Sequence, residues 1–220
     1  MTAKVIAVVN QKGGAGKTTL AMLLAGSLGN AGHRVLVADA DPQNTALRWA
    51  GVGEAFPADV EDLSGEEGKL HKHLRKREDD YDYIVIDSPP AATAPVTESA
   101  LRLAHVALVP VIPSPLDLWA SEMIRDAIQI AREKNTNLVA RLVMNQLQPN
   151  TLISREVIGL LPNFGIPLLS ATLRQRTVYK ECAAEGHSIE GLGSRAQMAA
   201  KEVDFLKRRV LALLRKVEAS

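Results

Sequence analysis

The chain has 220 residues, of which 46% are hydrophobic and 23% are charged, a balance typical of globular proteins. Its 26 basic and 25 acidic residues give a net charge of +1, so any binding of nucleic acid must depend on local clusters of charge. The single cysteine excludes an internal disulfide and a zinc knuckle, and no apolar run reaches the length of a membrane span. We therefore expect a cytoplasmic protein with a single domain over residues 1–220.

The first predicted element is a strand over Lys4–Val9, which is short, apolar and rich in β-branched residues. We expect no extra domain before it. A helix is predicted over Thr18–Leu28, and the string K-G-G-A-G-K-T-T lies between the two at residues 12–19. A glycine-rich turn that joins a strand to a helix indicates a phosphate-binding loop, and an ordinary glycine-rich turn is the alternative.

The chemistry of such a loop assigns a task to each residue. Its glycines let successive backbone N–H groups point inward, and the helix N-terminus adds the positive end of its dipole. Lys17 is predicted to reach the β- and γ-phosphates, and the Thr18 hydroxyl is predicted to bind Mg²⁺. The other predicted nucleotide-binding residues of the loop are Gly13, Gly14, Ala15, Gly16 and Thr19.

Lys12 is a second lysine, at the start of the loop. A cation there points away from its own phosphate cradle, so it could serve a facing subunit; a solvated surface charge is the alternative. Here the chain resembles the deviant Walker A ATPases of the ParA/MinD (SIMIBI-class) family, whose motif K-G-G-x-G-K-[ST]-T is matched at every fixed position. The resemblance implies ATP and Mg²⁺ as cofactors and an ATP-dependent sandwich homodimer. It also implies that Lys12 reaches the partner's phosphates, while Lys17 serves its own site.

A second strand is predicted over His33–Ala38 and is followed by D-A-D-P-Q-N at residues 39–44. Acids that follow a parallel strand lie at the carboxyl edge of the sheet, where open α/β sheets bind their ligands. The resemblance implies that Asp41 orients or activates the attacking water and that Asp39 supports the Mg²⁺ shell. Helix N-caps are the alternative for both acids.

Residues 56–76 carry weaker signals. A short edge strand is predicted within Phe56–Leu63, and an amphipathic helix is predicted over Glu66–Lys76. His71 and His73 do not share a helix face at their spacing, so we expect solvated side chains and no metal site there.

An apolar strand over Tyr81–Ile86 ends at Asp87 and has the Walker B arrangement. Asp87 is therefore predicted to hold Mg²⁺ through water and to help neutralise the γ-phosphate, with a helix cap as the alternative. Pro89 and Pro90 prevent the strand from continuing, and the small residues that follow indicate a mobile switch loop.

A core strand over Val106–Val111 leads into P-S-P-L-D at residues 113–117, and a helix is predicted over Leu116–Arg132. This string resembles the small, ParF-like branch of the ParA family, and also relatives that position carboxysomes or chemoreceptor clusters. In that branch the proline-rich loop and the next helix lie near the nucleotide-dependent dimer interface. Longer ParA relatives carry an N-terminal helix-turn-helix, which we expect this chain to lack.

A strand predicted over Ala140–Met144 ends at Asn145. The family uses an asparagine at the end of this strand to pair with adenine, so the resemblance implies this role for Asn145; a plain turn residue is the alternative. A helix over Ser154–Leu161 and a short strand over Ile166–Leu169 are predicted to follow.

The last segments carry the candidate DNA contacts. We expect a loop and then a helix over Ala171–Glu190, and a long amphipathic helix over Arg195–Val217. The candidate DNA-binding residues are Arg174, Arg176, Lys201, Arg208 and Arg215. We expect the last helix to pack its apolar face against the core and to leave the basic face in solvent; the alternative is that this basic face binds DNA phosphates without sequence preference.

The alternation of strands and helices predicts an α/β domain with a doubly wound, mostly parallel sheet of the P-loop NTPase class. With the resemblance, this implies a nucleoid-associated ATPase that hydrolyses ATP to ADP and phosphate. Its ATP dimer would bind DNA non-specifically and position or segregate a cargo such as a plasmid, a chromosome or carboxysomes. A ParB-like or cargo-adaptor protein would stimulate hydrolysis and release the dimer.

Rival functions share the same nucleotide chemistry. A MinD-like membrane-associated switch needs an amphipathic C-terminal segment that is free to dock on a bilayer, whereas here the last apolar stripe is part of a long helix. We therefore expect no membrane partner. Iron–sulfur relatives bridge their dimer with four thiolates, which Cys182 alone cannot supply from two subunits.

Overall fold

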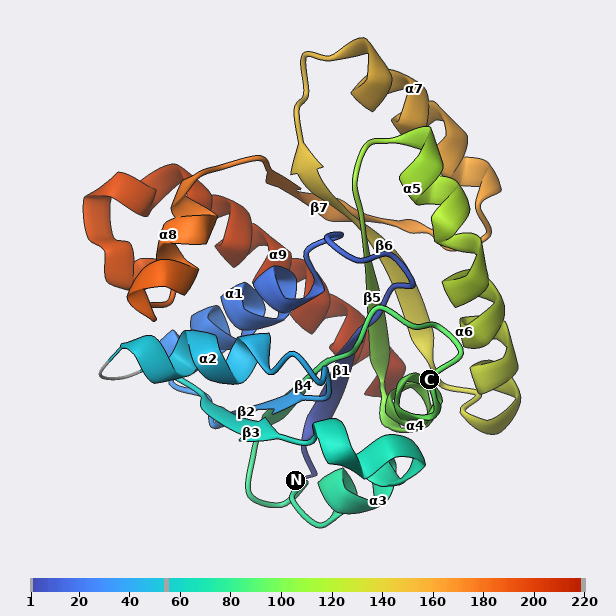
Figure 1. Cartoon of the computed structure of the whole chain (residues 1–220), viewed down its shortest axis with the longest axis vertical. Helices are drawn as coiled ribbons and strands as arrows, with labels where there is room; N and C mark the ends of the chain where they lie inside the picture. Colours follow the sequence, from blue (N-terminus) through green and yellow to red (C-terminus); the bar gives the residue numbers. More distant parts are fainter. Residues whose placement is uncertain (1, 54–55, 219–220) are drawn as a thin grey trace.

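The chain folds around one parallel sheet (Figure 1). The structure, a computed structural model, describes residues 2–53 and 56–218. Within these residues a seven-stranded sheet has the order β3-β2-β4-β1-β5-β6-β7, and every neighbouring pair is parallel. The strands are β1 (Lys4–Val8), β2 (Val35–Asp39), β3 (Asp59–Asp62), β4 (Tyr83–Asp87), β5 (Val106–Val111), β6 (Val139–Leu147) and β7 (Leu168–Arg174). The predicted α/β class is confirmed, and the sheet is parallel throughout.

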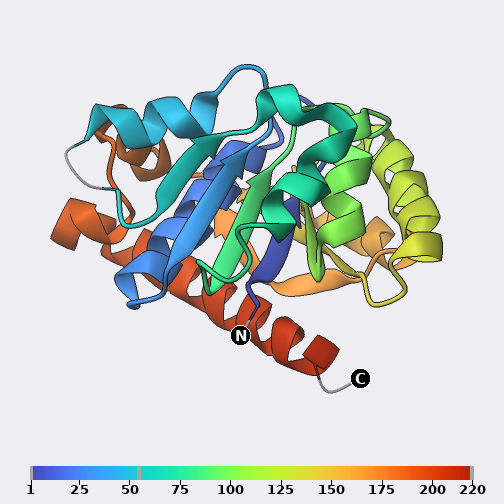
Figure 2. The same ribbon diagram turned by 90° about the horizontal axis from the view of Figure 1, so that it is seen from below.

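Helices cover both faces of the sheet (Figure 2). The α-helices are α1 (Lys17–Asn30), α2 (Thr45–Val52), α3 (Leu70–Arg75), α4 (Pro95–Leu103), α5 (Pro115–Ala120), α6 (Glu122–Lys134), α7 (Leu152–Leu160), α8 (Val178–Glu185) and α9 (Gln197–Glu218). Shorter 3₁₀ helices are η1 (Ser64–Lys69), η2 (Leu161–Asn163) and η3 (Glu190–Ala196). Helices α1, α2, α8 and α9 enclose one hydrophobic core with the sheet, and α3 to α7 enclose the other. No helix in the described ranges is both long and apolar enough to span a membrane.

The register of the central strands collects the predicted acids at one edge. Val8 of β1 pairs with Asp87 of β4, and Asp39 of β2 pairs with Asp87 from the other side. Strands β2 and β5 are buried along their whole length, as expected for apolar strands with helices on both faces. The carboxyl ends of β1, β2 and β4 therefore form a fixed platform for the loops that follow them.

Helix α9 packs against α1 and β7 through its apolar face. Its buried side chains include Val203, Leu206, Val210 and Leu214. The core-packing role expected for this face is therefore confirmed, and the basic residues lie on the remaining faces.

Two predicted helices are broken, for different reasons. The helix expected over Glu66–Lys76 is replaced by η1 and α3, and η1 is itself interrupted at Glu67, whose backbone is non-helical with φ of 41°. The helix expected over Leu116–Arg132 is divided into α5 and α6 at Ser121. The buried Ser121 hydroxyl donates to the carbonyl of Asp117 at 2.8 Å, a side-chain bond that competes with the helical ladder.

The prediction of solvated histidines in this region is wrong. The Nδ1 atom of His71 lies 2.7 Å from the Ser99 hydroxyl, and Nε2 of His73 lies 3.0 Å from a carboxylate oxygen of Glu61. Both rings are thus part of the packing between η1, α3 and their neighbours, which sequence spacing alone did not indicate.

Strands β6 and β7 are longer than predicted. Strand β6 continues past Asn145 to Leu147, and β7 continues to Arg174, so the segment expected as a loop after Ala171 begins as a strand. The pairing of β6 with β7 contains register shifts on both sides of Met144, and Gln146 has a φ of 52°. This irregular end of β6 is aimed at the phosphate loop.

Candidate nucleotide-binding site

The loop between β1 and α1 forms a cradle of backbone groups. Gly14 and Gly16 have φ angles of 79° and 88°, a region that L side chains rarely adopt. A Cβ atom added at Gly13 or Gly14 would meet nothing within 4 Å, so this side of the loop is open. In the described structure no side chain caps the first turn of α1, so its amide groups stay available to an anion. The geometry fits the predicted binding of nucleotide phosphates.

Lys17 lies inside this cradle. Its side chain is mostly buried, and its ammonium donates to the carbonyl of Lys12 at 3.2 Å. Burial lowers the pKa of Lys17, while the negative charges of Asp87 and Asp41 oppose that change. The ammonium is therefore held beside the loop, within reach of the charges of Asp87 at the end of β4 and Asp41 in the loop after β2.

Asp87 is the most unusual acid in the structure. It is fully buried at the end of β4, and neither carboxylate oxygen has a hydrogen-bond partner within residues 2–53 and 56–218. Burial raises the pKa of Asp87 to about 7; the nearby Thr18 hydroxyl opposes the change, and the Asp39 charge adds to it. A buried carboxylate without a partner is costly, and a cation beside it would remove that cost.

This arrangement fits Mg²⁺ held jointly by protein and nucleotide. The described part of the chain contains no group of three or more His, Cys, Asp or Glu side chains that could hold a metal ion. Mg²⁺ at phosphate sites usually takes one or two protein ligands, together with waters and substrate phosphates. The Thr18 hydroxyl and the Asp87 carboxylate are oxygen donors of that kind, and a nucleotide would supply the rest.

Asp39 has a structural task that favours the capping alternative. Its carboxylate accepts the amide N–H of Leu47, in the first turn of α2, at 3.0 Å and that of Asp41 at 3.3 Å. Burial raises the pKa of Asp39, and these backbone hydrogen bonds oppose the change. Asp39 therefore fixes the loop between β2 and α2, and its contribution to the Mg²⁺ shell stays a prediction.

Asp41 lies further out on that loop and is only half-buried. One carboxylate oxygen accepts the amide N–H of Gln43 at 3.0 Å, and the Asp41 charge reaches Lys17. Its role in orienting the attacking water stays a prediction.

Asn145 supports the phosphate loop from the end of β6. Its side-chain amide donates to the carbonyl of Ala15 at 2.8 Å, and its side-chain carbonyl accepts the amide N–H of Gln146. Gln146 in turn donates from its side chain to the carbonyl of Gly14 at 3.2 Å. Both polar ends of Asn145 are thus engaged within the chain, and adenine recognition by this residue stays a prediction.

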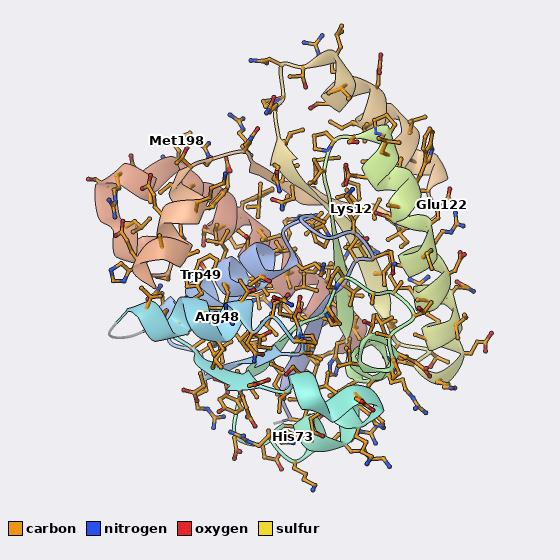
Figure 3. The ribbon with its side chains drawn as sticks, viewed as in Figure 1. Lys12, Arg48, Trp49, His73, Glu122 and Met198 are labelled. Carbon is orange, nitrogen blue, oxygen red and sulfur yellow. The ribbon has the colours of Figure 1, made fainter. Side chains whose placement is uncertain are left out.

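Lys12 points out of its own cradle. Its side chain is 45% exposed, and its ammonium lies 3.7 Å from a carboxylate oxygen of Asp117 on α5. In Figure 3, Lys12 lies at the rim of the loop, on the side of α5. Whether this lysine serves the phosphates of a facing subunit stays a prediction.

The sequence did not predict the contacts of three polar residues around the loop. Asn10 is buried just before the loop, Gln11 accepts the amide N–H of Ala92 at 2.5 Å, and Asp117 faces Lys12. Asn10 and Gln11 directly precede the motif, which was a usable signal. Asp117 ends the string P-S-P-L-D, but its contact with Lys12 was not predicted, since the two residues lie far apart in the sequence.

The predicted DNA-binding residues do not form one free patch. Glu202 of α9 accepts hydrogen bonds from the guanidinium of Arg176, at 2.6 and 3.2 Å, and from the hydroxyl of Tyr179 at 2.9 Å. Arg174 also forms an ion pair with Glu202, and Arg208 forms one with Asp204. The Glu202 carboxylate therefore joins α9 to Arg174 of β7, to Arg176 and to Tyr179 of α8, a structural task that the sequence did not predict. The exposed candidates Lys201 and Arg215 lie on α9.

Comparisons with known proteins show the family of the chain. Residues 6–189 match the family described as the CobQ/CobB/MinD/ParA nucleotide binding domain. A "Maintenance of carboxysome distribution protein A" from Halothiobacillus neapolitanus is 35% identical over 207 residues, which cover 94% of this chain and 95% of that protein. The chain therefore belongs to the ParA/MinD family of nucleotide-binding ATPase domains.

Solved structures share the fold. A Cyanothece McdA variant in complex with ATP has a TM-score of 0.79 at 18% identity, covering 95% of this chain and 96% of that chain. A cobyrinic acid a,c-diamide synthase from Mycobacterium smegmatis with bound ADP and magnesium has a TM-score of 0.65 at 23% identity, covering 84% and 91%.

Proposed function

We propose that this protein is an ATP hydrolase whose ATP-bound homodimer binds DNA without sequence preference and positions a cargo. The observation that carries the proposal is the pair of lysines on one loop. Lys17 is buried in the cradle, whereas the Lys12 side chain leaves it and is half-exposed. One loop thus presents a cation to its own phosphates and another to a facing molecule.

The residues of the site divide the work of phosphoryl transfer, which depends mainly on positioning and on charge stabilisation. Loop amides and Lys17 hold the β- and γ-phosphates. Thr18 and Asp87 would hold Mg²⁺, which would neutralise phosphate charge when bound. Asp41 orients the attacking water, and Lys12 of the facing subunit adds positive charge as the γ-phosphate leaves. Each site is complete only in the dimer, so hydrolysis is tied to assembly.

We propose a protein cargo of the carboxysome kind, because the 35% identical relative is named for the maintenance of carboxysome distribution. ATP holds the dimer on nucleoid DNA, an adaptor protein on the cargo stimulates hydrolysis, and the separated subunits leave the DNA. Exposed basic residues of α9 from both subunits, Lys201 and Arg215 among them, contact DNA phosphates.

Binding to random-sequence duplex DNA tests this function. The protein is measured with ATP, with ADP and without nucleotide, beside liposomes of anionic lipid. The proposal expects tight binding with ATP only, which weakens steeply as salt is raised. Binding to liposomes but not to DNA would replace it with a membrane switch, and binding to neither would indicate a metabolic ATPase.

A further inference from the structure

Asp117 is a carboxylate with an unusual setting. Its side chain is only 15% exposed, and its Oδ1 atom has no hydrogen-bond partner in the described part of the chain. The cation that it faces is Lys12, whose ammonium lies 3.7 Å from this same oxygen. A shielded carboxylate oxygen of this kind is stabilised mainly by that ammonium.

A buried polar bridge fixes the two partners relative to each other. The amide of Asn10 donates to the carbonyl of Pro110 at 2.8 Å and to the hydroxyl of Ser121 at 3.2 Å. The Ser121 hydroxyl donates to the backbone carbonyl of Asp117, and the backbone N–H of Lys12 donates to the side chain of Asn10 at 3.4 Å. Asn10 therefore connects the backbone of the loop with the end of α5, and the spacing of Lys12 from Asp117 is set by residues that are themselves buried.

This geometry restricts the rotamers of the Lys12 side chain. A free lysine has many rotamers, and some of them would fold the Lys12 ammonium back onto its own phosphates. A carboxylate on α5 selects rotamers that point away from the cradle. An ammonium has three donors, so contact with Asp117 leaves others for a phosphate of the facing molecule.

We propose that Asp117 is a positioning residue, which holds Lys12 extended so that it is presented to the nucleotide of a facing subunit. The inference rests on the proposed function, since it needs Lys12 to act across the dimer. Asp117 itself touches neither nucleotide nor the reacting atoms. Its contribution is to order the Lys12 side chain before the two subunits meet.

The test is the dimer affinity of variants with a non-hydrolysable ATP analogue, measured by analytical ultracentrifugation. Immobilising a long side chain typically changes affinity severalfold, so Asp117→Asn should weaken the dimer about 3- to 10-fold. Asp117→Glu keeps the charge and should restore most of the affinity. Asp79→Asn, which removes an exposed charge in the turn before β4, should leave it unchanged. Affinity of the monomer for ATP should not change in any of the three.

Repeating the Asp117→Asn substitution in a Lys12→Gln variant shows whether Asp117 acts through Lys12 or through a general effect on α5. With Lys12→Gln, which removes the ammonium and keeps a long polar side chain, Asp117→Asn should have no further effect. An equal loss in both backgrounds, a tighter Asp117→Asn dimer, or an unchanged one would overturn the positioning role. If Lys12→Gln alone dimerises as the unmodified protein does, the proposed function fails as well, which distinguishes the two failures.

Discussion

Gly16 offers the sharpest test of how the phosphate loop is built. Its φ is 88°, and a Cβ added there would clash with the side-chain amide of Asn145. Gly16→Ala therefore imposes a left-handed backbone on a residue with a side chain, which costs about 1–2 kcal/mol. It also displaces the amide that bonds Ala15, and one lost hydrogen bond costs about 0.5–1.5 kcal/mol.

The two costs together predict that Gly16→Ala lowers the free energy of unfolding by roughly 2–3 kcal/mol, measured by urea denaturation without nucleotide. The matched control is Gly13→Ala in the same loop. A Cβ at Gly13 meets nothing within 4 Å, so the free energy of unfolding should change by less than about 1 kcal/mol. Equal effects at the two glycines would refute the contact between the loop and Asn145 as the cause.

Three further predictions follow from the acids and from one histidine. Burial raises the pKa of Asp87 from 3.8 to about 7 in the folded protein. In the nucleotide-free protein its contribution to the free energy of unfolding is therefore fully present below the pKa of the unfolded chain and is lost as pH rises through about 7. Asp87→Asn should make the free energy of unfolding, measured by urea titration, depend less on pH, and an unchanged pH profile would contradict this reasoning. Asp41→Ala should abolish hydrolysis and leave an ATP dimer that persists on DNA in a filter-binding assay, whereas normal phosphate release would show that this acid has another task. His105 accepts the amide N–H of Val5 through Nδ1, and burial lowers its pKa, so its protonation favours unfolding and stability should fall as pH drops below 6.5. Between pH 7.5 and pH 5 the free energy of unfolding should fall more in the unmodified protein than in His105→Gln. An equal fall in both proteins would contradict this reasoning.

The parts of the fold that local sequence determines were predicted well. Strand β1, the loop glycines and α1 follow each other directly, so periodicity and turn chemistry were sufficient. The acids at the ends of β2 and β4 were found for a similar reason, because parallel strands bring their carboxyl ends to the same edge. The helix break at Ser121 was missed, since this buried serine is bonded to Asn10, a contact made only in the folded chain.

The side chains that support the phosphate loop from distant parts of the chain could not be predicted, because their contacts form only in the folded protein. Asn145 reaches Ala15 across 130 residues of sequence, and no local pattern encodes that contact. The neutralisation of Arg176 by Glu202 is also tertiary, because the two lie on β7–α8 and α9. A count of basic residues along the sequence therefore overestimates the charge that is free to meet DNA.

The central claim is that each active site is completed by Lys12 of the facing subunit, and mixing two inactive variants tests it most directly. Lys12→Ala and Lys17→Ala are each expected to hydrolyse ATP poorly alone. If Lys12 acts across the dimer, one site of the mixed dimer has its own Lys17 and the partner's intact Lys12, so ATP hydrolysis should return on mixing. No recovery, with mixed dimers confirmed by ultracentrifugation, would mean that both lysines serve the same subunit's nucleotide and would contradict the account.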